Sequence, residues 1–333
     1  MKIVKYDGAV LWDENVMGNV REDSGDRPEI DREDLRNILL DSLLPGTIKW
    51  GKKLNRVEPD PKAKDKHILF FDDVTVEMGV DLVVGADGAW SKVRPLLTDE
   101  KPYYSGISAI ELWSLDVEKK NPWLSEYVGK GNCFMFDEGR ALLSQRNGNG
   151  SVRAYASVRK PETWVEDCGI DWTDHAAARQ AIVTNHFNDC GEDIKKIILE
   201  SDDELIPRKL YMLPVGIKWD SKPGVTLIGD SAHLMTPFAG VGVNVAMADA
   251  LELARALISQ KDSIVAKAFS DSHNIATAIK EYEASMFPRA KENAEKTYRG
   301  LVGHFSGSGG EEFASKFRKY YEMRKAAQQE KEA

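Results

Sequence analysis

VTLIGDSAHLMTPFAGVGVNVAMADALELARAL, residues 225–257, is the stretch of sequence that decides the fold. Residues 225–228 form a short apolar run of β type, as expected for a strand buried on both faces. Gly229-Asp230 ends this run. The loop that follows contains Pro237, Gly240 and Gly242.

A helical pattern begins at Asn244. Residues then recur at spacings of three and four: Val245, Ala248, Leu251, Ala254 (or Arg255) and Ile258. This spacing predicts an amphipathic helix with those residues on its buried face. The strand-loop-helix order places Asp230 at the carboxyl end of a strand and directs the free N–H groups of the next helix toward a crevice. On the pattern alone, a generic strand-loop-helix of an α/β domain explains the stretch equally well.

The full string GDSAHLMTPFAGVGVN is more specific. It resembles the second FAD-binding motif of the single-component flavoprotein aromatic hydroxylases (group A), which include the tetracycline-inactivating monooxygenases. In that family the motif runs Gly-Asp-Ala-Ala-His, then Pro, then Gly-Gln-Gly-x-Asn. Here Ser231 replaces the first alanine and Val241 replaces the glutamine.

The resemblance implies a role in FAD binding for each matching position. Asp230 would accept hydrogen bonds from the ribityl chain. Main-chain N–H groups of Gly242, Val243 and Asn244 would lie close to the isoalloxazine ring. Pro237 and Gly240 belong to the same loop, and glycine at 240 and 242 lets the backbone approach the flavin without a Cβ. His233, a single histidine in this loop, is interpreted as structural rather than catalytic.

A second motif follows another apolar run, at residues 80–84. The run ends in Gly85-Ala86-Asp87-Gly88, which by itself is compatible with an ordinary turn. The positions Asp87, Gly88, Ser91, Val93 and Arg94 match Asp-Gly-x-x-Ser-x-Val-Arg, which in the same hydroxylases is linked to both FAD and NAD(P)H. We therefore expect Asp87 and Gly88 to bind the cofactor.

Arg32 lies in the first turn of a helix predicted after Asp31. Asp31 is a candidate cap with Asp34 at the third position, and Leu35, Ile38, Leu39 and Leu43 form an apolar stripe that Pro45 ends. A cation in the first turn opposes the helix dipole, which suggests an anionic ligand. An exposed arginine paired with Glu29 or Glu33 is the alternative. The segment resembles the one whose arginine contacts FAD in these hydroxylases, and this favours Arg32 as a cofactor contact.

Composition sets the outer limits. The chain has 333 residues, 42% hydrophobic and 30% charged, with a net charge of −9, which argues against a nucleic-acid partner. Its three cysteines form no zinc-like spacing, and no metal site is expected. No long uncharged apolar run and no secretory signal are visible, so we expect a cytoplasmic protein without a membrane partner, and a monomer.

The rest of the pattern predicts an α/β protein. We expect an incomplete FAD-binding domain of the glutathione-reductase-like Rossmann type, an antiparallel-sheet substrate domain and C-terminal helices. The predicted segments are 1–100 (partial FAD-binding), 101–218 (substrate sheet), 219–273 (return to the FAD-binding domain) and 274–333 (helices). Within them, residues 147–150 are expected to turn a hairpin, 21–27 and 306–310 to be loops, and Pro288 to break a helix. Residues 47–50 are expected to form a strand.

One family element has no match. Residues 1–90 contain no Gly-x-Gly-x-x-Gly turn of the kind that holds the FAD pyrophosphate. We therefore expect this sequence to be a truncated form that starts inside the first domain of the family.

The function implied by the resemblance is an FAD-dependent monooxygenase. NAD(P)H would reduce the flavin, O2 would give a flavin hydroperoxide, and one oxygen would pass to a small aromatic or polyketide-like substrate. No side-chain nucleophile is required, and we identify no catalytic side chain. The alternatives are an inactive remnant that binds a ligand or a partner, and a nicotinamide dehydrogenase, which the missing dinucleotide motif disfavours.

Overall fold

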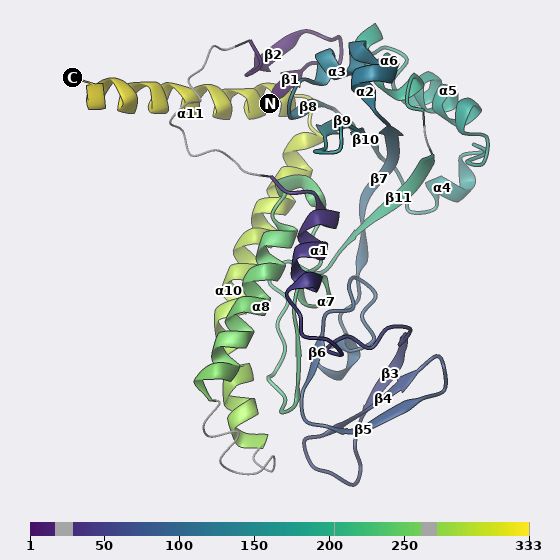
Figure 1. Cartoon of the computed structure of the whole chain (residues 1–333). Helices are drawn as coiled ribbons and strands as arrows, with labels where there is room; N and C mark the ends of the chain where they lie inside the picture. Colours follow the sequence, from purple (N-terminus) through teal and green to yellow (C-terminus); the bar gives the residue numbers. More distant parts are fainter. Residues whose placement is uncertain (17–28, 203, 261–271, 333) are drawn as a thin grey trace. The chain divides into compact units, whose positions relative to one another are not determined.

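The computed structural model describes residues 1–16, 29–202, 204–260 and 272–332 (Figure 1). The chain forms two compact units, each made of several segments. Unit 1 comprises residues 1–44, 106–210 and 302–333, and unit 2 comprises residues 45–105 and 211–301. The loop predicted at 21–27 lies outside the described residues. The four-segment domain division remains a prediction.

Unit 1 is built on a seven-stranded sheet with the order β11-β7-β10-β9-β8-β1-β2. Neighbouring strands in the run from β7 to β8 are antiparallel, whereas β1 runs parallel to β8. The strands are β1 (Lys2–Val4), β2 (Val10–Asp13), β7 (Tyr103–Ser114), β8 (Asn132–Asp137), β9 (Arg140–Arg146), β10 (Val152–Arg159) and β11 (Leu205–Met212). The antiparallel sheet predicted for this region is confirmed.

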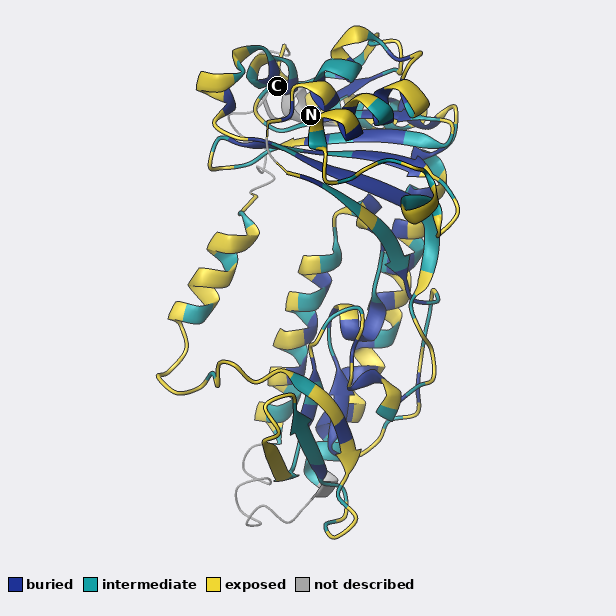
Figure 2. Cartoon of the chain, turned by 90° about the vertical axis from the view of Figure 1, so that its right-hand side faces the viewer, coloured by how far each residue is buried: buried dark blue, intermediate teal, exposed yellow. Residues whose placement is uncertain are grey.

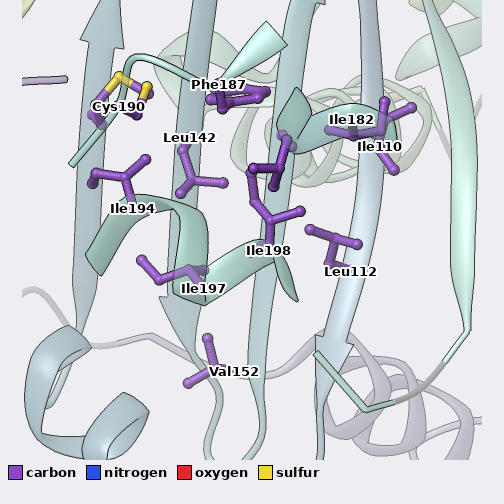
Figure 3. Packing of buried hydrophobic residues seen from close by; sticks show 14 of the residues in the cluster. Ile110, Leu112, Leu142, Val152, Ile182, Phe187, Cys190, Ile194, Ile197 and Ile198 are labelled. Carbon is purple, nitrogen blue, oxygen red and sulfur yellow. The ribbon is translucent and has the colours of Figure 1, made fainter. Parts of the chain in front are cut away.

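Side chains along β10 alternate between the core face of the sheet and its other face. Ala154 and Ala156 are buried in the main core, whereas Arg153 and Tyr155 point to the other face. Helices cover the core face and bring Ile194, Ile197 and Ile198 onto it (Figure 3). Burying an isoleucine of this kind contributes about 1.5–3 kcal/mol. The helices of this part are α2 (Val117–Lys120), α3 (Pro122–Val128), α4 (Trp164–Asp167), α5 (His175–His186) and α6 (Glu192–Leu199).

The predicted hairpin at residues 147–150 joins β9 to β10, and its register is continuous from Val152 opposite Arg146 onward. Helix α1 (Arg32–Asp41) forms as predicted. The predicted cap is wrong, because the Asp31 carboxylate accepts a hydrogen bond from Gly148 N–H of the hairpin (3.1 Å) and makes none within its own helix. The apolar stripe of α1 is exposed, with Ile38 and Leu39 more than half accessible.

Unit 2 contains two small sheets. An antiparallel sheet is formed by β3 (Leu54–Pro59), β4 (His67–Phe71) and β5 (Val76–Val80), and a parallel pair by β6 (Val83–Gly85) and β12 (Val225–Leu227). The predicted strand at residues 47–50 is wrong, since this segment is irregular and Trp50 is 76% exposed, with no buried face to favour an extended conformation. The remaining elements are the 3-10 turns η1 (Arg94–Leu96) and η2 (Pro237–Ala239) and the helices α7 (Asp230–His233), α8 (Gly242–Ser259) and α10 (Ser272–His304).

Helix α8 is present as predicted, but its buried face is not the predicted one. Val245, Asp249 and Leu253 are buried, whereas Leu251 and Ile258 are 51% and 67% exposed. The apolar pattern pointed to the wrong face because a charged residue, Asp249, occupies the centre of the buried one. Figure 2 shows these burial classes along the chain.

Helix α10 runs through Pro288, so the predicted break is wrong. A proline inside a helix removes one hydrogen bond and costs about 3 kcal/mol or more. Tyr282, Met286 and Ala290 on both sides of Pro288 are buried in the core of unit 2, and this packing offsets the loss.

The last of the predicted C-terminal helices is α11 (Gly309–Glu332). It packs through Phe313 and Phe317 against a small cluster with Ile3 and Trp12 of the first two strands. Gly309 and Gly310, predicted as part of a loop, begin this helix and are buried. Together with α10, it confirms the C-terminal helices expected from the sequence.

Candidate functional site

Strands β6 and β12 place both sequence motifs at the same edge of unit 2. The two strands are parallel and paired, with Val83 opposite Val225 and Gly85 opposite Leu227. Because parallel strands end at a common edge, Asp87 and Asp230 both follow the carboxyl end of a strand there. This is the edge at which open α/β sheets bind ligands.

Ser231 joins the two motifs directly. Its hydroxyl donates to Asp87 Oδ1 (3.0 Å) and accepts from Gly88 N–H (2.9 Å), and the residue is fully buried. Burial by itself would raise the pKa of Asp87. Hydrogen bonds from Ser91, Lys92 N–H and Ser231 outweigh burial and lower it. The serine that replaces the usual alanine of the family motif therefore helps to keep the Asp87 carboxylate ionised.

Arg94 makes a second bridge between the motifs. It is 3% exposed, and its guanidinium donates to the carbonyl oxygens of Ser231 (2.8 Å), Ala89 (2.8 Å) and Asp230 (3.1 Å). Burial lowers the pKa of Arg94, while the carboxylates of Asp87 and Asp230 oppose this shift. The sequence motif contained Arg94, but the pattern did not reveal that it holds both loops.

Asp249 of α8 lies behind the Gly229-Asp230 turn and is fully buried. Its Oδ2 accepts from Gly229 N–H (2.9 Å) and lies 2.6 Å from His233 Nε2, while its Oδ1 accepts from Arg289 Nη2 (3.0 Å). Gly229 has a φ of +58°, which glycine adopts without strain. His233 is thus a buried partner of Asp249, in keeping with its interpretation as structural.

The sequence prediction missed Asp249. The one available signal was an acidic residue at helical spacing between Val245 and Leu253. Its partner Arg289 lies 40 positions further along, where nothing in the sequence links the two.

The loop before α8 has open space beside its backbone at two glycines. Gly240 has a φ of +64°, and a Cβ added at Gly240 or Gly242 would meet no described atom within 4 Å. Helix α8 has 18 residues, and no described side chain caps its first turn, where Val243 and Asn244 are exposed. Free N–H groups at a helix start carry partial positive charge and suit an electron-rich ligand.

These features fit the FAD contacts implied by the sequence. A Cβ at Gly240 or Gly242 would meet no described atom, which leaves space for a flat ring against the backbone, and Asp230 beside them is exposed. Unit 2 holds all but one of the predicted cofactor residues: Asp87, Gly88, Asp230, Pro237, Gly240, Gly242, Val243 and Asn244. Arg32 belongs to unit 1, where it begins α1; burial raises the pKa of Tyr155 in the same unit, and the charge of Arg32 opposes this rise.

Within the described ranges, no group of three or more His, Cys, Asp or Glu side chains is arranged to hold a metal ion. None of the helices in those ranges has the length and apolar character needed to cross a membrane.

Comparison with known proteins identifies close similarities. The model of the "FAD binding domain" family matches residues 29–263. The monooxygenase asqM of Emericella nidulans is 33% identical, in an alignment that covers 90% of this chain and 79% of that protein.

Two solved structures show the same fold. Klebsiella pneumoniae HpxO, complexed with FAD and uric acid, has a TM-score of 0.64 at 22% identity. The alignment covers 89% of this chain and 68% of the HpxO chain. The tetracycline destructase Tet(51) has a TM-score of 0.60 at 18% identity, in an alignment that covers 96% of this chain and 77% of the Tet(51) chain.

Proposed function

We propose that this chain uses NAD(P)H and O2 to hydroxylate a small aromatic or polyketide-like molecule. The premise is that the chain belongs to the FAD binding domain family and is an FAD-dependent monooxygenase of the aromatic-hydroxylase type. The observation that carries the proposal is the joining of the two cofactor motifs by Ser231 and Arg94, beside a glycine loop that leaves space for a ligand. FAD, when bound, supplies electron transfer from NAD(P)H and oxygen transfer from O2 to the substrate.

The residues of unit 2 would bind and orient the cofactor. Asp230 would accept hydrogen bonds from the ribityl hydroxyls, and Asp87 and Gly88 would contact the cofactor from the neighbouring strand end. The network of Asp249, His233 and Gly229 would fix the turn that presents Asp230. An orienting network of this kind raises affinity because the turn is ordered before the ligand arrives.

The start of α8 would stabilise negative charge that develops on the ring. N–H groups of Gly242, Val243 and Asn244 are held at the positive end of an 18-residue helix. Fixed donors aimed at developing charge reduce the reorganisation that the reaction would otherwise need. Pro237 and Gly240 shape this loop, and Arg32 of unit 1 is proposed as a further FAD contact.

Anaerobic reduction tests the proposed electron donor without knowledge of the substrate. The protein is loaded with FAD and mixed with NADH or NADPH in the absence of O2. We expect bleaching of the flavin absorbance by at least one of the two, and its return when O2 is admitted. A flavin that binds but is reduced by neither nucleotide would overturn the use of NAD(P)H. A protein that binds no FAD would favour the inactive remnant.

A further inference from the structure

The face of the large sheet opposite its helices carries a charged and aromatic cluster. In β7 and β10, Tyr155 lies opposite Glu111 and Arg153 opposite Trp113. Their neighbours Ile110, Leu112, Ala154 and Ala156 point into the core under the helices, so these four side chains point the other way. Strand β7 lies between β10 and β11 (Figure 1), and β11 adds Arg208 to the same face.

Glu111 is the centre of this cluster and is 2% exposed. Its carboxylate accepts hydrogen bonds from Arg153 Nη2 (2.6 Å), Trp113 Nε1 (2.9 Å) and Arg208 Nε. Burial by itself would raise the pKa of Glu111, but the hydrogen bonds from Arg208 and Trp113 and the charges of both arginines lower it. One ionised carboxylate therefore holds two guanidinium groups, which leaves this arginine pair, Arg153 and Arg208, with one positive charge in excess.

Aromatic rings flank the arginine pair. The guanidinium carbon of Arg153 lies 5.0 Å from the ring centroid of Trp113 and 4.8 Å from that of Tyr155. The Arg153 side chain is 24% exposed and that of Arg208 is 49% exposed. A planar cation beside two rings is a surface on which a flat ligand stacks and an anionic group is bound by a fork of N–H donors.

Helix α1 begins beside this face of the sheet, within unit 1. Asp31 at the start of α1 accepts a hydrogen bond from the β9–β10 hairpin, and burial raises the pKa of Tyr155 while the charge of Arg32 opposes this rise. Arg32 is a proposed FAD contact, and the core under the helices covers the opposite face of the sheet, so we take the polar face as the one open to a substrate. This step rests on the proposed function.

We propose that the arginine pair binds an acidic group of the substrate, a carboxylate or an ionised phenol or enol on an aromatic ring, and that Glu111 is the positioning residue for both guanidinium groups. An excess cation among partly buried rings is costly without a counter-ion, and an anionic ligand supplies one. The net charge of the whole protein is −9, so the excess positive charge of the arginine pair is opposite in sign to the net charge. The substrate class is therefore an acidic, electron-rich aromatic compound.

Lys209 is the matched control. It follows Arg208 in the same strand but points to the helix side, where it pairs with Glu166 of α4 (2.7 Å). Arg208→Gln and Lys209→Gln each remove one positive charge from adjacent positions on opposite faces. Arg208→Lys keeps the charge and loses the planar fork.

Binding of matched acid and amide ligands tests the proposal. The ligands are 2-hydroxybenzoate with 2-hydroxybenzamide, and 2-naphthoate with 2-naphthamide, titrated by tryptophan fluorescence into the FAD-loaded protein and into the protein without added FAD. We expect the wild-type protein to bind at least one acid at least about tenfold more tightly than its amide, as expected for a charge-assisted hydrogen bond. Arg208→Gln should abolish this preference, Arg208→Lys should reduce it and Lys209→Gln should keep it.

Two outcomes would overturn the proposal: no preference for either acid in the wild-type protein, or equal preferences in Arg208→Gln and Lys209→Gln when circular dichroism shows both to be folded. If Arg208→Gln does not fold, Arg208→Lys decides by the same comparison. The titration requires no electron transfer. Loss of flavin reduction with an intact acid preference would thus contradict the proposed function alone, and the reverse result would contradict the acid site alone.

Discussion

Replacement of Asp249 by asparagine should destabilise unit 2 and loosen the cofactor turn. The Asp249 carboxylate is fully buried and faces three donors, on Gly229, His233 and Arg289. An asparagine side chain of the same shape has one acceptor oxygen, and its NH2 group must then face one of these donors.

The magnitude follows from the contacts that are lost. If the amide oxygen stays with Gly229 and His233, the NH2 group opposes Arg289 Nη2, and one charge-assisted hydrogen bond worth about 1.5–3 kcal/mol is lost. Arg289 keeps Glu252 (2.5 Å), which limits the loss. We expect a decrease of about 2–4 kcal/mol in the free energy of unfolding for Asp249→Asn. For Asp249→Ala we expect about 3–5 kcal/mol, because all three donors lose their acceptor.

Urea denaturation followed by circular dichroism measures this change, and hydrogen exchange in residues 225–259 locates it. Glu252→Gln is the control, because Glu252 binds the same arginine but is 33% exposed, and its loss should cost less than about 1 kcal/mol. Asp249→Asn should also raise the Kd for FAD at least about tenfold, since Gly229 N–H loses its fixed partner. Equal stability of Asp249→Asn and the wild-type protein, or an equal cost for Glu252→Gln, would refute this reasoning.

Three further changes test other parts of the structure. Gly85→Ala places a Cβ 2.5 Å from Leu227 Cδ2 and should cost about 1–3 kcal/mol in urea unfolding, whereas Gly303→Ala in α10, with no described atom within 4 Å, should cost nothing. Arg94→Lys keeps a cation but cannot reach all three carbonyl oxygens, so a FAD titration should show at least about fivefold weaker binding; an unchanged Kd would contradict the bridge. Burial lowers the pKa of His304 to about 4, below the value of about 6.5 in an unfolded chain, so the unfolded chain takes up the proton first and stability falls as pH drops from about 6.5 toward 4. His304→Phe should reduce this slope in pH-dependent unfolding by up to about 1.4 kcal/mol per pH unit, and an unaltered slope would show that His304 does not cause it.

Local pattern was enough to predict much of the fold. The apolar runs that became β6 and β12, the turn at residues 147–150 and the helix after Asn244 depend on neighbouring residues, and all three are present. The meeting of Asp87 and Asp230 at one edge also follows from strand order, since both end a parallel strand.

The errors arise where distant residues decide the outcome. Asp249 is buried because Arg289 and His233 surround it, and the break at Pro288 is absent because both flanks are packed. The cluster around Glu111 joins strands up to 97 positions apart, so no local spacing reveals it. Side-chain partners of this kind become visible only when the register of the sheet is known.

The most direct test of the central claim is the affinity for FAD of Asp230→Ala compared with Asp220→Ala. Both residues are exposed carboxylates of unit 2, but only Asp230 follows the strand end beside the glycine loop. Loss of a hydrogen bond to a charged group costs about 1.5–3 kcal/mol, so fluorescence titration should give about a 10- to 150-fold higher Kd for Asp230→Ala and an unchanged Kd for Asp220→Ala. Equal FAD affinity in the two variants would contradict the assignment of this strand end as the flavin site.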